Sequence, residues 1–367
     1  MIRHVSNMVK VNKLLLLSVF IIAFCALQSK AQTACTQTLR QARTVFDEGR
    51  IHEIEGLLEG CIKDGLNDDE RTEAYRLLIL SYIYLDETDK ADNAMLALLK
   101  DNHAYEINET ADPTELINLY RTFRTKPIFF WGFKLGAATT FVNVIKNYGL
   151  NDANSTFGEY SNTVGIEGGL MFEKIFFNRI AAHADLSYNN NSFTYENNYL
   201  NEPDGNALIE HLSTETQTSL GFSLMGQYLI KTESQLKKKG QQKIRLPYVG
   251  IGATLKYITS SDLAAETDRD NGGGADGAAE DLIGEGFRKQ LNPTIDIEAG
   301  YKLKSKLSFI NLSVRYSYGL LNLTDKHYDN GRLSTFYGWA ANDISTHFVT
   351  ISAGILIPKY SPKKLIK

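Results

Sequence analysis

Apolar and polar side chains alternate along many segments in the second two-thirds of the chain. In Thr294–Leu303, every odd-numbered residue is apolar and every even-numbered residue is polar, charged or glycine. Successive side chains of a β-strand point to opposite faces, so this segment would have one apolar face and one charged face. The alternation therefore predicts an amphipathic strand.

Further segments share this pattern, and each is about as long as a tilted strand that crosses a bilayer, roughly 9–11 residues or more. The eight predicted strands are Phe129–Thr140, Thr163–Glu173, Asn178–Tyr188, Glu215–Ile230, Arg245–Ile258, Thr294–Leu303, Leu307–Tyr318 and Ile344–Ile357. The connectors alternate in length, with long polar ones at 141–162, 189–214, 259–289 and 319–343. An antiparallel barrel has its short turns on one rim and its long loops on the other.

Two folds are compatible with such strands, and they differ in where the apolar face points. In a soluble sandwich this face packs inward, whereas in a membrane barrel it contacts lipid and the charged residues line the interior. An even strand number places both barrel ends on the short-turn side. Strand number, loop alternation and the position of the ends agree, so we predict an eight-stranded antiparallel transmembrane β-barrel over residues 127–358. The soluble sheet remains the alternative.

The polar face of the predicted strands is rich in ionisable side chains. These residues are Lys134, Glu167, Arg179, His183, Asp185, Lys256, Asp296, Glu298, Lys302 and Arg315. Side chains about fill the interior of an eight-stranded barrel. Apart from the histidine, the basic and acidic residues nearly balance, which predicts an internal network of ion pairs and hydrogen bonds rather than a selective pore. Aromatic residues at the strand ends, namely Phe129, Phe130, Trp131, Phe176, Phe177, Tyr188 and Tyr318, are expected at the headgroup level.

Residues 32–126 show helical spacing of apolar residues and predict a separate helical domain. Its helices are expected over 36–47, 51–62, 67–84, 90–100 and 112–124. Helix pairs of this size resemble tetratricopeptide repeats. The residues in the positions of that pattern are Tyr75, Leu78, Tyr82, Ala91 and Met95. A helical domain without true repeats is the alternative.

The N-terminus has the features of a secretory signal peptide over residues 1–31. Basic residues precede the apolar run 14–24, and Ser29-Lys30-Ala31 forms a small-x-small cleavage site. An uncleaved helical anchor is the alternative. Cleavage would leave Cys35 and Cys61 in an exported chain, and we expect them to form a disulfide rather than two free thiols.

No catalytic residue, cofactor or metal site is predicted. The formal net charge of −4 gives no indication of a nucleic-acid partner. The acidic loop that starts at Asp268 has Ala279 where a calcium loop needs a glutamate. His347 and Ser345 share one strand face, but no acid is placed by spacing to orient the imidazole. A lipid-modifying enzyme is therefore the least favoured class.

The predicted cleavage before Gln32, the Cys35/Cys61 helical pair, the segment Asp112–Pro127 and the small barrel together resemble a known family. They resemble Bacteroidota outer-membrane β-barrel proteins of the PorT-like or OmpA-like type that carry an N-terminal helical repeat domain. The resemblance implies an outer-membrane location, contact with outer-membrane lipid and a periplasmic helical domain. Some members of the family serve type IX secretion and gliding. The basic tail 359–367 departs from the aromatic C-terminus of many such barrels.

We therefore expect a non-enzymatic outer-membrane protein. Its barrel would anchor the helical domain, and this domain would bind a periplasmic or other envelope protein. An accessory component of secretion or transport across the outer membrane is the alternative.

Overall fold

The chain folds into two compact units. The computed structural model describes residues 34–147, 158–198, 209–232, 244–269, 275–276, 280–305, 308–325 and 341–365. The helical unit comprises the chain up to Lys126 together with the segment from Tyr360 onward, and the strand unit is Pro127–Lys359. The expected signal peptide, residues 1–31, lies outside the described residues.

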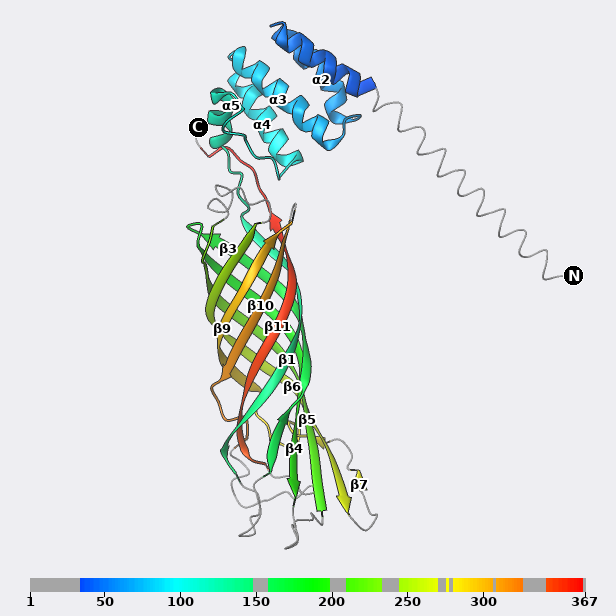
Figure 1. Cartoon of the computed structure of the whole chain (residues 1–367), viewed down its shortest axis with the longest axis vertical. Coiled ribbons are helices and arrows are strands. Elements are labelled where there is room, and N and C mark those ends of the chain that lie inside the picture. The colour runs from blue at the N-terminus through cyan, green and yellow to red at the C-terminus, as the bar shows by residue number, and fades with distance from the viewer. Residues whose placement is uncertain are drawn as a thin grey trace, which may run out of the picture. The chain divides into compact units, whose positions relative to one another are not determined.

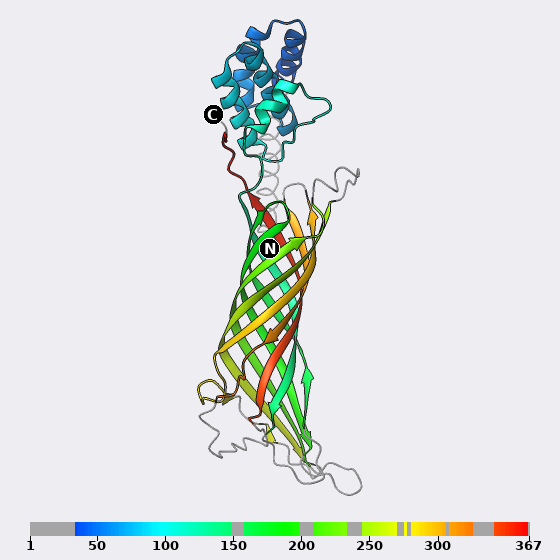
Figure 2. The same ribbon diagram turned by 90° about the vertical axis from the view of Figure 1, so that its left-hand side faces the viewer.

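Eight long strands of the strand unit form a closed antiparallel ring (Figures 1 and 2). They are β1 (Phe129–Lys146), β3 (Val164–Phe176), β4 (Ile180–Asn198), β5 (Ile209–Leu229), β6 (Arg245–Arg269), β9 (Leu291–Lys304), β10 (Phe309–Gly319) and β11 (Asp343–Lys359). Each pairs with the next long strand along the chain, and β1 pairs with β11 to close the ring. The predicted eight-stranded antiparallel architecture is confirmed.

Three short strands extend the ring at one end: β2 (Glu159–Asn162) pairs with β4, while β7 (Ala275–Asp276) and β8 (Glu280–Asp281) pair with β6. The first and last long strands and the first tight turn meet at the opposite end. Phe130 of β1 lies opposite Pro358 of β11 on one side and Glu173 of β3 on the other. We call this the short-turn end of the barrel.

Strands β4, β5 and β6 continue well past the segments that the sequence predicted as strands. The 25 residues of β6 would span roughly 80 Å if fully extended, far more than a bilayer core. The expectation of loops at 189–214 and 259–289 was therefore wrong over much of their length. Beyond Tyr188 the outward residues of β4 are polar, so the apolar alternation stops although the strand continues.

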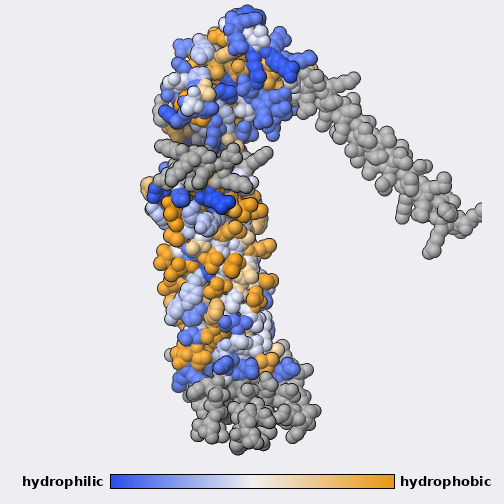
Figure 3. All heavy atoms as spheres, viewed as in Figure 1, coloured by the Kyte–Doolittle hydropathy of each residue, from blue (hydrophilic) through white to orange (hydrophobic). Residues whose placement is uncertain are grey.

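The outer surface of the ring is apolar, and Figure 3 shows hydrophobic side chains gathered over the strands. Leu135, Val164, Ile251 and Ile351 are 74%, 73%, 65% and 63% exposed. Most of the expected rim aromatics are also exposed, with Phe177 at 90%. Phe130 is an exception, because its side chain points inward and is buried.

The helical unit has its own hydrophobic core. Its helices are residues 34–47, the 3₁₀ turn η1 (Ile51–Glu53), α2 (Ile54–Lys63), α3 (Asp68–Tyr84), α4 (Thr88–Asp101) and α5 (Thr114–Arg121). Asn67 caps α3, since its side chain accepts a hydrogen bond from the Glu70 amide while the Glu70 side chain accepts one from the Asn67 amide. None of the described helices combines the length and apolar character that a membrane span requires.

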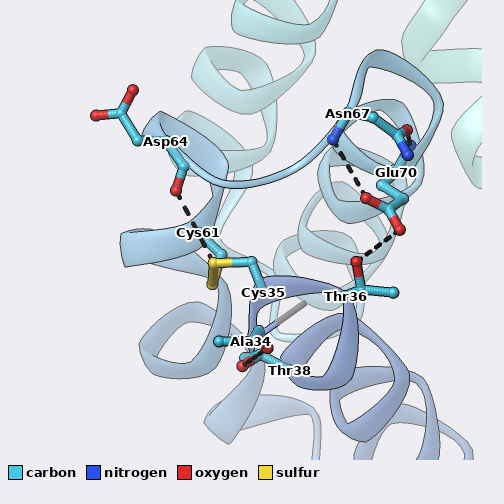
Figure 4. The surroundings of a disulfide bond; sticks show 8 residues. All are labelled: Ala34, Cys35, Thr36, Thr38, Cys61, Asp64, Asn67 and Glu70. Atoms are coloured by element: carbon cyan, nitrogen blue, oxygen red, sulfur yellow. Dashed lines mark hydrogen bonds between the residues drawn. A yellow bond between two sulfur atoms is a disulfide. The ribbon is translucent and has the colours of Figure 1, made fainter. Parts of the chain in front are cut away.

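Cys35 and Cys61 form a disulfide between the first helix and α2, with their Cα atoms 5.4 Å apart (Figure 4). Close by, the Thr36 hydroxyl donates a hydrogen bond to the Glu70 carboxylate, at 2.9 Å. The first helix is thus attached both to α2 and to the N-terminus of α3.

The C-terminal segment is part of the helical unit. Lys364 forms an antiparallel bridge with Phe123, whose side chain lies in the helical core. The sequence predicted a separate basic tail over 359–367. The described part of this tail, up to Leu365, instead packs on the domain that begins at the other end of the chain.

Candidate functional site

The barrel interior holds most of the charged residues that the sequence singled out. Arg315 of β10 lies at the centre, where its guanidinium is 2.8 Å from both Asp185 Oδ2 and Glu298 Oε2. Lys134 of β1 is 2.9 Å from Asp185 Oδ1 and 2.5 Å from Glu167 Oε1. All five side chains are buried.

Lys302 and His183 complete this arrangement. The Lys302 ammonium contacts the Glu173 carboxylate at 2.5 Å and the Gln227 carbonyl oxygen at 2.7 Å. The Gln227 amide donates to Glu298 at 3.2 Å. The two His183 nitrogens lie 3.4 Å from Glu173 and 3.5 Å from Asp185.

These contacts form one closed circuit that we call the ionic ring. Its members are Asp185, Arg315, Glu298, Gln227, Lys302, Glu173 and His183, with Lys134 and Glu167 attached at Asp185. The residues come from six different strands. The ionic ring therefore links opposite walls of the barrel through side chains alone.

Two predicted residues are buried in the barrel without a described ion pair to the ring. The Asp296 carboxylate accepts hydrogen bonds from the hydroxyls of Thr254 and, at 2.8 Å, Thr294. The Lys256 ammonium lies over the Phe348 ring, 3.4 Å from its centroid. A cation over an aromatic face is stabilised by the ring quadrupole.

Arg179 does not belong to the interior, contrary to the sequence prediction. It lies in the turn between β3 and β4, is partly exposed, and its guanidinium donates to the Tyr228 hydroxyl, at 2.9 Å. Phe177 and Asn178 of this turn have positive φ angles of 50° and 64°. The strand alternation that predicted an inward Arg179 therefore does not extend into the turn.

Sequence reasoning missed several members of the ionic network. Glu173 is the last residue of the predicted strand Thr163–Glu173 and was not included among the interior residues, although it has the same inward parity as Glu167. Gln227 and Tyr248 have polar side chains that are not ionic, so the balance of charges along the strands did not indicate them; the Tyr248 hydroxyl donates to Glu298 at 2.8 Å. The parity of each strand, applied to every polar residue, would have found all three.

The short-turn end of the interior is filled by apolar side chains. One cluster contains Phe130, Met171 and Leu356, and Phe130 meets Phe309 edge-on with ring centroids 5.6 Å apart. A second cluster adds Leu229, Ile244, Leu246 and Tyr248. These side chains form an apolar layer between the ionic ring and this end of the barrel.

The opposite end is closed by a second apolar layer and a buried ion pair. The layer consists of Phe193, Ile258, Leu323 and Ile344, followed by Tyr195, Leu263, Leu282 and Phe287. Arg288, from the segment between β8 and β9, binds the Glu215 carboxylate of β5 through two guanidinium nitrogens, at 2.8 and 2.9 Å. Its third nitrogen donates to the Thr324 hydroxyl. Connecting segments thus fold into the mouth of the barrel.

Described side chains thus occupy the interior at the ionic ring and near both ends of the barrel. Among the described residues, no group of three or more His, Cys, Asp or Glu is arranged to hold a metal ion. His347 accepts a hydrogen bond from the Gly319 amide and stacks on Tyr318, with ring centroids 4.4 Å apart. Ser345 is buried. This histidine is thus placed as part of an aromatic cluster on the barrel wall.

No protein-family model matches the chain, and no curated protein matches it. The chain is similar to solved bacterial barrel proteins. The outer membrane protein OprG from Pseudomonas aeruginosa is 14% identical, with 64% of this chain and 98% of OprG covered and a TM-score of 0.35. Neisserial surface protein A is 13% identical, with 63% and 96% covered and a TM-score of 0.29. Ail, the attachment invasion locus protein of Yersinia pestis, is 13% identical, with 62% and 99% covered and a TM-score of 0.25.

Proposed function

We propose that this chain is a non-enzymatic outer-membrane protein whose barrel anchors a helical protein-interaction domain in the periplasm. The observation that carries the proposal is the inverted distribution of polarity in the strand unit. Aliphatic side chains cover the outside of a closed ring, while the ionic ring is buried inside it.

An apolar exterior around a charged interior is favourable when the hydrocarbon core of a membrane surrounds the barrel. A soluble sandwich would bury the aliphatic face between two sheets, yet here this face is the exposed one. The closed ring also leaves the long strands with partners on both sides, as lipid requires of a spanning sheet. Trp131 and Phe177 near the short-turn end, and Tyr188 and Tyr318 farther along the strands, would lie at the two headgroup layers.

The filled interior favours an anchor over a channel. A solute would have to displace two apolar layers and a network of buried ion pairs, at a cost of several kcal/mol for each charge left unpaired. A role as accessory component of secretion is compatible with an anchor, provided that the partner binds the helical domain.

The helical unit is the part that we assign to protein interaction. Of the positions that resemble a tetratricopeptide repeat, Leu78, Tyr82, Ala91 and Met95 are buried between helices, and Tyr75 is partly buried. Helix pairs with this packing present exposed faces to partner proteins. The proposal of a periplasmic helical unit is supported by the short-turn end, where β1 begins and β11 ends, because short turns of such barrels face the periplasm.

Membrane fractionation followed by gel electrophoresis tests the anchor. We expect the mature protein in the outer-membrane fraction, with a folded band that shifts in mobility only after boiling. A monodisperse water-soluble monomer in the absence of detergent would overturn the proposal.

Protease treatment of whole cells tests the orientation. The helical unit should survive external protease in intact cells and be degraded after the outer membrane is permeabilised. A known periplasmic protein serves as the control for permeabilisation. Degradation in intact cells would show that the domain faces outward.

A further inference from the structure

The C-terminal segment is held on the helical unit in the manner of a bound peptide. The Arg124 amide donates to the Lys363 carbonyl at 2.9 Å, and the Leu365 amide donates to the Thr122 carbonyl at 2.8 Å. An antiparallel bridge joins Phe123 and Lys364 between these bonds. Extended peptides are commonly recognised in this way, by backbone pairing along an exposed edge.

Side chains add specific contacts to this backbone pairing. The Arg124 guanidinium donates to the Ser361 carbonyl through two nitrogens, at 2.9 and 2.5 Å. The Lys364 ammonium pairs with the Asp92 carboxylate of α4. The Tyr360 ring stacks on His103, with centroids 5.1 Å apart and planes inclined by 22°.

The contacting residues recur with the period of an extended strand. Tyr360 and Pro362 are partly buried, whereas Ser361 and Lys363 are exposed; Lys364 is also exposed but its ammonium contacts Asp92. Since alternate side chains of an extended segment share one face, Tyr360 and Lys364 both lie on the face turned to the helices. This surface thus contacts an aromatic residue and a lysine four positions later.

Several residues of this surface are held in place by contacts within the helical unit. The Phe123 side chain is only 5% exposed in the helical core, which holds the pairing edge in place. The Thr122 hydroxyl donates to the Leu119 carbonyl at 2.7 Å. His103 Nδ1 lies 2.7 Å from the Leu99 carbonyl oxygen, and Asp92 is part of α4. Thr122, Phe123 and His103 are thus held by contacts within the helical unit, whereas the Asp92 and Arg124 side chains make their described contacts to the C-terminal segment.

We propose that this surface is a binding site for an extended basic peptide and that the chain's own C-terminal segment occupies and masks it. The site, which we call the tail seat, consists of Thr122–Arg124, Asp92 and His103. Its occupant is residues 360–365. The proposal goes beyond membrane anchoring and does not depend on it, because every residue involved lies in one unit.

Covalent attachment explains why the seat is occupied. A segment tethered by a short linker acts at an effective concentration in the millimolar range. A free peptide with the same sequence would therefore compete poorly against it. Weakening the contacts of the attached segment should open the seat to a free peptide without removing any residue of the helices.

The test uses the full-length protein in detergent and a fluorescent peptide with the sequence Tyr360–Lys367. The double variant Tyr360→Ala/Lys364→Glu weakens the attached segment and leaves the seat intact. We expect fluorescence anisotropy to show saturable peptide binding by this variant, with an apparent affinity at least about tenfold higher than for the unmodified protein. Adding Asp92→Lys to the variant should lower that affinity again by about tenfold.

Lys363→Glu is the matched control. It makes the same change of charge in the neighbouring residue, whose side chain is exposed and whose described contact to the seat is through its carbonyl. We expect the seat of this variant to remain closed to the peptide.

Three results would overturn the proposal. One is a double variant that keeps its helical circular dichroism but does not bind the peptide. Another is equal binding by Lys363→Glu. The third is loss of helical structure in the double variant, because the segment would then be a part of the fold and not a ligand.

Discussion

At the scale of single residues, the ionic ring brings together buried charges, each of which would destabilise the fold if it had no partner. Arg315 forms ion pairs with two carboxylates, and Lys302 binds one carboxylate and one amide oxygen, so that each of these charges has a partner. Replacing an intact buried ion pair by apolar residues is often nearly neutral, whereas removal of one partner is strongly destabilising. The network is therefore better understood as mutually dependent contacts than as a sum of stabilising pairs.

Arg315→Met should destabilise the barrel, because it leaves Asp185 and Glu298 buried with fewer compensating charges. We expect a loss of about 3–5 kcal/mol in the free energy of unfolding, measured by urea titration in lipid vesicles. Lys231→Met, which removes an exposed charge near the end of β5, should change this quantity by less than about 0.5 kcal/mol. Equal effects of the two substitutions would contradict the role of the ionic ring.

Tyr82 gives the helical unit a pH dependence in alkali. Burial, together with a hydrogen bond to Glu55, raises the pKa of the Tyr82 phenol to about 12. The folded state therefore favours the neutral phenol, and this contribution is fully present below pH 10 and lost as the pH rises through 12. Tyr82→Phe should reduce the stability lost between pH 9 and pH 11.5 by on the order of 2 kcal/mol, followed by urea titration with circular dichroism. Tyr84→Phe, at an exposed position of the same helix, should leave the loss unchanged.

The sequence identified the charged interior well where strand parity was intact. Asp185, Glu298 and Arg315 lie inward as their alternation with aliphatic residues predicted. Arg179 was misplaced because a turn with positive φ interrupts that alternation. The closed circuit of side-chain contacts in the ionic ring could not be predicted, because it depends on how strands distant in sequence are staggered across the barrel.

At the scale of elements, the strands were predictable only where their outward residues are apolar. In those segments, hydrophobicity alternates with a period of two and predicts a strand. Beyond Tyr188, the outward residues Asn190, Ser192 and Thr194 are as polar as a loop, so β4 was cut short. Burial still alternates there, with Phe193 and Tyr195 inward, but two aromatic residues are too weak a signal on which to extend a strand.

The disulfide should stabilise the helical unit alone. Cys35 and Cys61 are 26 positions apart, and a loop of this size stabilises by about 3 kcal/mol through the entropy of the unfolded chain. We expect Cys35→Ser/Cys61→Ser to lower the thermal midpoint of the helical circular dichroism signal. The boiling-dependent gel shift of the barrel should be retained, and its loss would indicate coupling between the two units.

At the scale of the whole molecule, the two apolar layers and the ionic ring predict a barrel that does not conduct ions. Protein reconstituted in a planar bilayer should show no sustained conductance at either polarity. An open porin of known conductance is the control for insertion conditions. Stable, reproducible current steps from the purified protein would contradict the filled interior and favour the transport alternative.

The pairing of β1 with β11 sets the order in which the protein can be completed. The barrel needs Phe129 and Lys359 side by side, so β11 must be translated before the barrel can close. A premature stop at the start of β11 would leave β1 and β10 with unpaired edges, and it would also delete the residues that occupy the tail seat. We therefore expect a nonsense mutation just before β11 to be as damaging as one before β1, with the shortened product degraded by envelope proteases.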